Sequence, residues 1–386
     1  MDPTDQRYDQ GDCGDQLMPA PLIMQFGTSR FLQAHVDYFV AKSIEAGRSS
    51  TPIAVVQTTS NPSGRARVEA FNQMERYPVR IQGIESGEAI DRVEWVGSVE
   101  CALQASQSWE QVVELFCQRV THVVSNTADN GYQLAESDHP DDRPPSSFPA
   151  KLVSLLFARF SSTGQGVTIM PCELIVDNGQ VLKGTILSLA RDWRLSEAFL
   201  AWLDEECIWV NSLVDRIVSS PLDPIGAVTE PYALWAIEDQ PGLVVPCVHN
   251  AIRVVSNLAP FEWLKLGVLN LSHTYIVERW RQADALNVET VYQAMNHKAL
   301  RRDLEAVLSD EVIPILQSMQ LGEDVKAYVD AVRERFLNPY LEHKLSDIAQ
   351  NHANKVERRI LPVWQARSGV DCPRLTACLR QHHLIK

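Results

Sequence analysis

LIMQFGTSRFLQAH, residues 22–35, sets the architecture of the first half of the chain. Five mostly apolar residues, Leu22 to Phe26, predict a short buried strand, and Gly27 directly after them predicts a tight turn. The next segment, RFLQAHVDYFVAKSIEAG, repeats apolar side chains with a helical period, which predicts one helix ending at Gly47. A strand, a glycine turn and a helix N-terminus can together bind a pyrophosphate group.

The glycine pattern of this turn is incomplete. In the dinucleotide fingerprint G-x-G-x-x-G, Ser29 stands at the second glycine and Leu32 at the third. The segment alone therefore leaves two interpretations open, a nucleotide site and an ordinary strand–turn–helix. For the nucleotide site, the candidate cofactor-binding residues are Phe26, Gly27, Thr28, Ser29, Arg30 and Phe31.

Beyond this segment, short apolar runs alternate with amphipathic ones up to about residue 255. Strands are predicted at 53–57, 93–99, 122–125 and 167–170, helices at 109–119, 151–160 and 185–193, and a polar loop at 135–147. Residues 208–211 lead into the segment VDRI, and two β-like runs follow at 232–237 and 248–255. Such alternation is typical of an α/β fold with a doubly wound parallel sheet. From Pro260 onward only helical patterns remain. We therefore expect a tail at 1–18, an α/β domain at 19–258 and a helical domain at 259–386.

The composition excludes several classes of protein. The net charge is −14, with 35 Lys and Arg against 49 Asp and Glu, which argues against a nucleic-acid partner. No apolar run reaches the roughly 18–20 residues that cross a bilayer, and the polar N-terminus does not have the pattern of a secretory signal. We expect a cytoplasmic protein with no membrane partner.

The cysteines and histidines do not follow a metal-binding spacing. The eight Cys form no CxxC pair, and several lie in apolar runs, so we expect buried, reduced thiols. The ten His include no HExxH motif. The sequence therefore predicts no metal site.

SNTADNG, residues 125–131, directly follows a predicted strand. A loop at the carboxyl end of a parallel strand is where the nicotinamide ribose of a dinucleotide would lie, which makes Ser125, Asn126 and Thr127 candidates for cofactor contact. An ordinary Asn/Asp/Gly turn is the alternative.

KLGVLNLSH, residues 265–273, contains three polar groups in an apolar segment. Asn270 and His273 are three residues apart, so a helix places them on adjacent positions of one face, with Lys265 near the expected helix start. Partial burial lowers the pKa of a lysine and lets it accept an alcohol proton, while an amide can donate to the developing alkoxide. The alternative is a surface lysine beside an Asn and a His satisfied in the core.

Seven segments, in chain order, are similar to the successive blocks of one known family. They are QFGTSRFLQAHVDYFV, SNTADNGY, FPAKLVSLLFARF, MPCELIVDNG, NSLVDRIV, LKLGVLNLSHT and RERFLNPYLEHKL. The chain therefore resembles the mannitol dehydrogenase family of long-chain polyol and sugar-acid dehydrogenases, and within it the tagaturonate (altronate) reductase branch. NSLVDRIV and the Lys-x4-Asn-x2-His spacing are the most specific of these features.

The resemblance implies a Rossmann-type N-terminal domain, an all-α C-terminal domain, and metal-independent hydride transfer in a cleft between them. It implies that Lys265 is the general base and that Asn270 and His273 bind and polarise the reacting oxygen. It also implies that Asp215 contacts substrate hydroxyls or holds the site together, an ion pair with Arg216 being the alternative.

The sequence departs from the family pattern at three places. Ser29 replaces the usual glycine, so the pyrophosphate is expected to sit differently. Asp129 stands where the family has a glutamate, so a proton exit path through this acid would have a shorter reach. The chain ends at LTACLRQHHLIK whereas relatives continue through further helices, so we expect part of the C-terminal cap to be absent.

The resemblance further implies a linear sugar acid as substrate, with tagaturonate reduced to altronate. Arg335, His343 and Lys355 are candidates to bind its carboxylate, with surface helix charge as the alternative, which we prefer for Lys355. Two other functions remain open: a polyol dehydrogenase acting on mannitol or arabinitol, and a non-catalytic protein that binds NAD.

The cofactor choice rests on the strand at 53–57, which ends without the acid that commonly bonds the ribose 2′-hydroxyl of NAD. Arg65 and Arg67 follow, and an arginine there can bind the 2′-phosphate of NADP. We expect a helix from about residue 65 that directs both arginines to solvent. In addition, the tagaturonate reductases that the chain resembles use NAD. The sequence therefore predicts NAD, with NADP as the alternative.

Overall fold

The computed structural model describes residues 20–127, 131–283 and 287–386. Its largest sheet has six parallel strands in the spatial order β5-β2-β1-β6-β7-β8. These strands are β1 (Leu22–Phe26), β2 (Ile53–Gln57), β5 (Val99–Gln104), β6 (Val120–Ser125), β7 (Thr168–Pro171) and β8 (Ile208–Trp209). This is the order of a doubly wound Rossmann sheet, whose winding direction reverses between β1 and β6. The predicted fold class of this part of the chain is confirmed.

Helices cover both faces of this sheet, because successive side chains of a strand point to opposite faces. Leu22, Met24 and Phe26 of β1 share one apolar core with α4 to α7, whereas Ile23 belongs to the core formed with α1 to α3. The helices are α1 (Arg30–Ala34), α2 (Val36–Glu45), α3 (Pro62–Gln73), α4 (Trp109–Gln118), α5 (Phe148–Ser162), α6 (Asn178–Asp192) and α7 (Glu197–Glu205).

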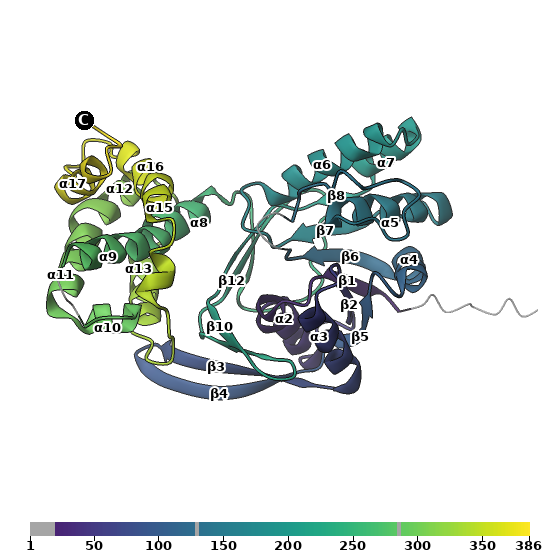
Figure 1. The fold of residues 1–386 in the computed structure, drawn as a ribbon, viewed down its shortest axis with the longest axis horizontal. Helices are drawn as coiled ribbons and strands as arrows, with labels where there is room; N and C mark the ends of the chain where they lie inside the picture. The colour runs from purple at the N-terminus through teal and green to yellow at the C-terminus, as the bar shows by residue number, and fades with distance from the viewer. Residues whose placement is uncertain (1–19, 128–130, 284–286) are drawn as a thin grey trace, which may run out of the picture.

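Two smaller sheets lie between the Rossmann sheet and the C-terminal helices (Figure 1). Their strand orders are β10-β11-β3-β4 and β13-β12-β9. The strands are β3 (Tyr77–Glu85), β4 (Glu88–Val96), β9 (Ser212–Asp215), β10 (Val218–Pro221), β11 (Ala227–Thr229), β12 (Leu234–Glu238) and β13 (Ile252–Val255). The β3–β4 hairpin extends beneath the helical part, where the Asn338 amide donates to the Gln82 carbonyl at 3.0 Å.

All regular elements that the structure describes after β13 are helical, and their apolar side chains form a core of their own. They are α8 (Ala259–Leu264), the π-helical turn η1 (Lys265–Asn270), α9 (Leu271–Gln282), α10 (Val291–Asn296), α11 (Lys298–Val307), the π-helical turn η2 (Leu308–Val312), α12 (Ile313–Ser318), α13 (Val325–Phe336), α14 (Leu345–Ile348), α15 (His352–Arg359), α16 (Leu361–Gln365) and α17 (Pro373–Gln381). We propose that the two domains divide at 258/259, where strands give way to helices. None of the described helices is long and apolar enough to span a membrane.

The structure divides one predicted helix and one predicted strand into two elements each. The single helix expected from Arg30 to Gly47 is interrupted at His35, whose backbone (φ −122°, ψ −86°) leaves the helical region between α1 and α2. The strand expected at 93–99 is the end of β4 and the beginning of β5, separated by Gly97 and Ser98. The predicted tail at 1–18 lies outside the described residues.

Candidate functional site

The glycine turn after β1 lies at the point where the Rossmann sheet reverses. Gly27 has φ +121°, and a Cβ there would lie 3.0 Å from the Asn126 carbonyl oxygen, so only glycine fits without strain. Phe26 pairs in register with Ser125, which brings the turns after β1 and β6 together. Ser29 joins them, because its hydroxyl caps α1 at Leu32 N (3.2 Å) and donates to Asn126 Oδ1 (3.3 Å).

This turn has two of the features of a pyrophosphate site, a glycine that allows close approach and a place at the switch point of the sheet. Carboxyl ends of parallel strands at a topological switch point are where open α/β sheets bind ligands, and glycine allows close approach of an anion. The predicted residues 26–31 and 125–127 are thereby brought together, with Arg30 exposed and Thr28 buried beneath the turn. Asp129 lies outside the described residues.

Glu173 organises the second turn, and sequence reasoning missed it. Its Oε1 accepts hydrogen bonds from the backbone and hydroxyl of Thr127 (both 2.9 Å), and its Oε2 from Ser125 Oγ (3.0 Å) and Tyr132 Oη (3.1 Å). Glu173 is buried directly after β7, the strand next to β6. An acidic residue two positions beyond a buried strand was the signal that could have identified it.

Lys265 opens a π-helical turn inside a helix that runs on from α8 to α9. It was expected near a helix start, but six helical residues precede it. In an α-helix, residues five apart diverge by about 140°. The i→i+5 hydrogen-bond pattern of a π turn instead stacks Lys265 and Asn270 one turn apart, a distortion that is frequent at functional sites.

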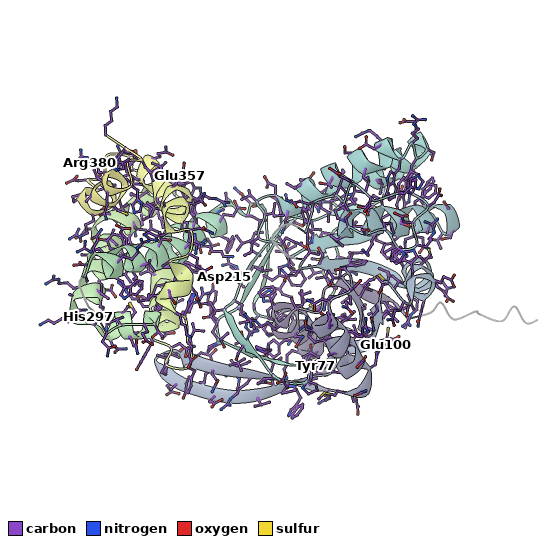
Figure 2. All side chains as sticks on the ribbon, in the orientation of Figure 1. Tyr77, Glu100, Asp215, His297, Glu357 and Arg380 are labelled. Carbon is purple, nitrogen blue, oxygen red and sulfur yellow. The ribbon has the colours of Figure 1, made fainter. Side chains whose placement is uncertain are left out.

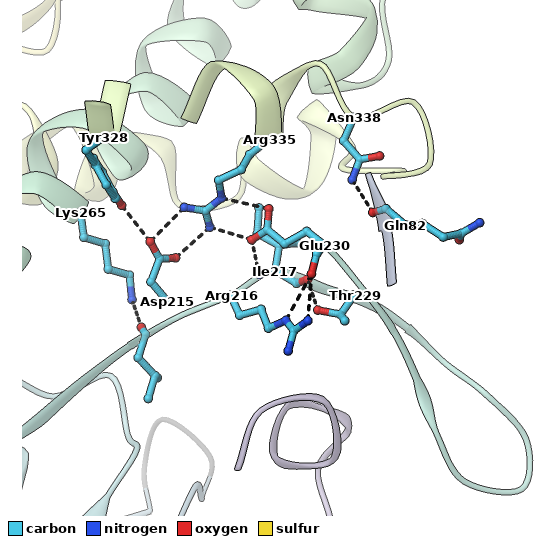
Figure 3. Close-up of polar contacts among 11 residues, drawn as sticks. Gln82, Asp215, Arg216, Ile217, Thr229, Glu230, Lys265, Tyr328, Arg335 and Asn338 are labelled. Atoms are coloured by element: carbon cyan, nitrogen blue, oxygen red, sulfur yellow. Dashed lines mark hydrogen bonds and ion pairs between the residues drawn. The ribbon is translucent and has the colours of Figure 1, made fainter. Parts of the chain in front are cut away.

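Asp215, at the end of β9, is fixed by the helical part of the chain (Figure 3). Arg335 of α13 donates to both of its carboxylate oxygens, at 2.8 and 2.9 Å, and Tyr328 donates to Oδ2 at 2.8 Å. Figure 2 places Asp215 at the junction between the strands and the helices. Arg216 does not pair with Asp215 but donates to the Glu230 carbonyl, so the alternative of an Asp215–Arg216 pair is wrong.

Arg335 has a different task from the one the sequence predicted. Its Nε and Nη2 also contact the Glu230 carboxylate, at 2.9 and 2.8 Å, so the two carboxylates occupy four of its five N–H donors. The Arg335 and Asp215 side chains are only 3% and 4% exposed. Arg335 therefore has no pair of N–H donors left for a substrate carboxylate, and it instead holds Asp215 in place.

The surroundings of Lys265 favour its neutral form. Its Nζ donates to the Val214 carbonyl at 2.8 Å, next to Asp215. Burial lowers the pKa of Lys265 below that of a free lysine, Asp215 acts in the opposite direction, and the charges of Arg335 and Arg359 lower it further. Burial alone would raise the pKa of Asp215, but the Arg335 guanidinium outweighs this effect and keeps the carboxylate ionised.

His273 and His343, two predicted site residues, lie against each other with ring centroids 4.6 Å apart. Burial lowers the pKa of both imidazoles, so both are neutral at pH 7. His273 Nε2 and His343 Nδ1 are buried without a hydrogen-bond partner among the described residues. Buried polar atoms without partners are rare, so this pair offers two positions for hydrogen bonds to a ligand.

Two cations of α15 lie close to this pair. Burial lowers the pKa of Lys355 and of Arg359, and both charges act on His273. Lys355 Nζ donates to the Ile348 carbonyl at 2.8 Å, and Arg359 contacts the Thr274 hydroxyl at 3.5 Å. Neither side chain forms a salt bridge with any residue that the structure describes. Arg359 was missed in the sequence, because nothing in HANKVERRI distinguishes it from its exposed neighbour Arg358.

Arg67 lies against the glycine turn. Its Nε donates to the Thr28 hydroxyl at 3.1 Å, while Arg65 is exposed. The prediction that both arginines point to solvent was therefore wrong for Arg67. The helix α3 begins at Pro62, three residues earlier than predicted, capped by Asn61.

Within the described residues, a single group of His, Cys, Asp or Glu side chains has metal-binding geometry, namely Glu278, Cys378 and His382. Of these, Glu278 lies on α9, C-terminal to His273, and the group does not include Lys265, Asn270 or His273.

Comparison with known proteins covers nearly the whole chain. Residues 21–244 match the mannitol dehydrogenase Rossmann domain, and residues 257–380 match the mannitol dehydrogenase C-terminal domain. The altronate oxidoreductase of Bacillus subtilis (strain 168) is 32% identical over 88% of this chain and 74% of its own length. The altronate oxidoreductase of Klebsiella pneumoniae (strain 342) is 32% identical over 92% and 78%.

Two solved structures have the same fold. A D-sorbitol dehydrogenase in substrate-free form superimposes with a TM-score of 0.78 at 22% identity, covering 89% of this chain and 75% of its own. The Pseudomonas fluorescens mannitol 2-dehydrogenase, in a ternary complex with NAD and D-mannitol, superimposes with a TM-score of 0.74 at 18% identity, covering 94% and 79%.

Proposed function

Because this chain belongs to the mannitol dehydrogenase family, whose members are oxidoreductases acting on CH–OH groups, we propose that it interconverts a linear sugar acid and its keto form. Tagaturonate and altronate are the proposed pair. The altronate oxidoreductases among its relatives support this substrate class. The observation that carries the proposal is the partly buried Arg359, which contacts the Thr274 hydroxyl next to His273 and which, like Lys355 one helical turn away, forms no salt bridge with a described residue.

Lys265 is the proposed general base for alcohol oxidation. One N–H of its neutral amine donates to the Val214 carbonyl, which directs the amine while its lone pair accepts the hydroxyl proton. Because Arg335 already neutralises Asp215, that carboxylate stabilises the ammonium form of Lys265 less than a free one would. The amine can therefore lose its proton to solvent between turnovers. In ketone reduction the ammonium returns the proton to the oxygen.

Asn270 and His273 are proposed to bind the reacting oxygen. Asn270 lies one π turn from Lys265, and its side chain makes no hydrogen bond to a described residue, so its amide is free to donate to an alkoxide. His273 Nε2 offers a second contact, and His343 Nδ1 a contact to a neighbouring substrate group. Charge on the oxygen is thus stabilised by the Lys265 ammonium and neutral donors, and we propose that hydride transfer needs no metal.

The substrate carboxylate is proposed to bind Arg359 and Lys355 rather than Arg335. Both are partly buried on one face of α15, four residues apart, and Arg359 contacts the hydroxyl of Thr274, the residue next to His273. A carboxylate in reach of two partly desolvated cations forms charge-assisted hydrogen bonds.

The proposed cofactor is NAD, held by the turns after β1 and β6. Gly27, the Ser29–Asn126 contact and the strand order fit a dinucleotide. When bound, its nicotinamide accepts or supplies the hydride. The proposed residues Lys265, Asn270 and His273 all lie in the helical part of the chain, whereas the proposed cofactor site lies on the Rossmann sheet. The substrate would therefore bind between the helical part and that sheet.

A substrate panel tests the proposal. We expect NADH oxidation with tagaturonate to exceed that with fructose by about ten-fold or more in kcat/KM, the effect of roughly 1.4 kcal/mol of differential binding. In Arg359→Met this preference should disappear, whereas Arg358→Met, an exposed neighbour, should keep it. Equal use of both substrates by the wild type would instead support a polyol dehydrogenase.

The catalytic role of Lys265 is tested separately. Lys265→Met keeps the length of the side chain and removes the amine, so turnover should fall by at least about 10²-fold, the usual scale for a positioned base. NADH binding, followed by fluorescence, should be unchanged. Near-normal turnover in this variant would rule out the mechanism, and NADH binding without turnover of any substrate in the wild type would indicate a non-catalytic protein.

A further inference from the structure

A second cluster of reactive side chains joins three helices of the C-terminal part, away from Lys265. Glu278 lies on α9, His352 opens α15, and His382 caps the C-terminal end of α17. The Nε2 atoms of His352 and His382 lie 2.7 and 2.8 Å from the same oxygen, Glu278 Oε2. Cys378 lies one turn before His382 on α17, and its Sγ, the carboxylate and the His382 ring present ligand atoms within 4.8 Å of one another.

The spacing within α17 suits chelation. Cys378 and His382 are four residues apart, so a helix places them on the same face. Glu278 reaches them from another helix, with its second oxygen, Oε1, held by the Gln282 amide at 2.7 Å. A ligand pair on one helix completed by a third side chain from elsewhere is a common way to build a metal site.

The charge on Glu278 has no permanent partner. Three N–H donors converge on its two oxygens, an environment that suits an ionised carboxylate, and its side chain is 4% exposed. Among the described residues, no Lys or Arg lies within ion-pair distance of it, and the only pairs are with the two imidazoles. Burying a carboxylate without a cation is costly, and a bound metal ion would remove that cost.

We propose that Glu278, Cys378 and His382 bind a divalent transition metal ion, zinc by preference. Thiolate, imidazole and carboxylate together are a donor set that zinc favours, with water in the fourth position of a tetrahedron. Hard cations such as Mg²⁺ prefer oxygen ligands and are disfavoured here. On binding, the ring proton of the neutral His382 moves from Nε2 to Nδ1 so that Nε2 can bind the ion, and the thiol proton of Cys378 leaves to solvent.

His352 orients the carboxylate in this site rather than binding the ion. Its Nε2 holds Glu278 Oε2 from the other side, as outer hydrogen-bond donors commonly do for metal-ligating carboxylates. The His382 side chain is 18% exposed, which gives an ion a path from solvent. The site would be structural, because it fastens α17 to α9, the helix that carries His273.

Metal binding to the full-length, tag-free protein tests this proposal. After dialysis against a chelator, Zn²⁺ titrated in competition with a chromophoric chelator should bind at one equivalent. Co²⁺ should give the near-ultraviolet thiolate-to-metal absorption band. Added Zn²⁺ should raise the midpoint of thermal unfolding by several degrees, while kcat at low temperature stays unchanged. That last readout separates the site from the proposed hydride-transfer chemistry.

Matched variants identify the ligands. Cys378→Ser and His382→Gln should each weaken zinc binding at least about 100-fold, and Cys378→Ser should abolish the Co²⁺ band; His352→Gln, which removes an outer partner, should weaken it about 10- to 100-fold. The controls are Cys372→Ser, a second buried thiol, and His383→Gln, an exposed neighbour, and both should bind zinc normally. Absence of the Co²⁺ band in the wild type, or equal zinc affinity in the wild type and Cys378→Ser, would overturn the proposal. The spectrum and titration of the wild type decide the matter even where a variant fails to fold.

Discussion

At the scale of single residues, the pH dependence of the reaction should report Lys265. Its pKa is lowered by burial, so the neutral amine that accepts a proton forms at a lower pH than in a free lysine. Alcohol oxidation should therefore rise with pH through this pKa, and ketone reduction, which needs the ammonium, should fall through it. The kcat/KM profiles in the two directions are the measurement.

A control separates Lys265 from the other titratable group. Burial also lowers the pKa of His273, but a neutral imidazole is not the proposed base. His273→Gln should lower the plateau of the oxidation profile and leave the position of the rising limb unchanged. A limb that moves or vanishes in His273→Gln, while persisting in Lys265→Met, would assign the base to the histidine.

Cofactor choice also belongs to the residue scale. We expect NADH to be preferred over NADPH by a modest margin, because the only arginine beside the glycine turn, among the described residues of α3, is already bonded to Thr28. Comparing kcat/KM for NADH and NADPH, in the wild type and in Arg67→Ala, is the measurement. Arg65→Ala, which removes an exposed arginine of the same helix, is the control. A preference for NADPH that is lost only in Arg67→Ala would show that Arg67 binds the 2′-phosphate.

At the scale of elements, the sequence predicted buried strands better than irregular helices and exposed strands. Apolar runs at 22–26 and 53–57 matched β1 and β2 to the residue, since a strand buried on both faces has a continuous apolar signal. The β4 strand was obscured because most of its side chains are exposed. Its hairpin partner alternates, and Ser86-Gly87, both with positive φ, forms the turn. The π turn at Lys265 has no known local signature, so its stacking of Lys265 on Asn270 could not be predicted.

The turn between β1 and α1 provides a test at this scale. Gly27→Ala should destabilise the protein by about 1–3 kcal/mol, because an L-residue at φ +121° is strained and its Cβ meets the Asn126 carbonyl. NADH binding should weaken several-fold in the same variant. Gly47→Ala, at φ +66° with open space around its Cβ, should lose about 1 kcal/mol and bind NADH normally. If both variants changed NADH binding equally, the result would contradict the proposal that the Gly27 turn binds the cofactor.

At the scale of the whole molecule, the sequence predicted the α/β part, the helical part and the family, but not how the parts meet. The motif at 265–273 is local, whereas Asp215 and Arg335 are 120 residues apart and become partners only through the fold. The sequence alone therefore suggested that the Arg335 guanidinium was free to bind a substrate carboxylate. Likewise, of the proposed metal ligands only Cys378 and His382 are close in sequence, and Glu278, 100 residues before Cys378, joins them only through the fold. Contacts of this kind depend on tertiary packing, which periodicity does not encode.

The Asp215–Arg335–Glu230 cluster is the buried electrostatic link between the strands and the helical part (Figure 3). Arg335→Met should leave two buried carboxylates without the guanidinium that they share, so the free energy of unfolding should fall by about 3–5 kcal/mol. It should also raise the pKa of Lys265, since Arg335 lowers that pKa and the released Asp215 charge raises it. The rising limb of alcohol oxidation would then move to higher pH.

Arg333→Met, on the same helix, is the control. It breaks only half-exposed pairs with Glu305 and Asp330, so the free energy of unfolding should fall by no more than about 1 kcal/mol, with the pH profile unchanged. Denaturant unfolding and the pH profile of both variants test this, and similar stability losses for the two would show that the cluster does not hold the parts together.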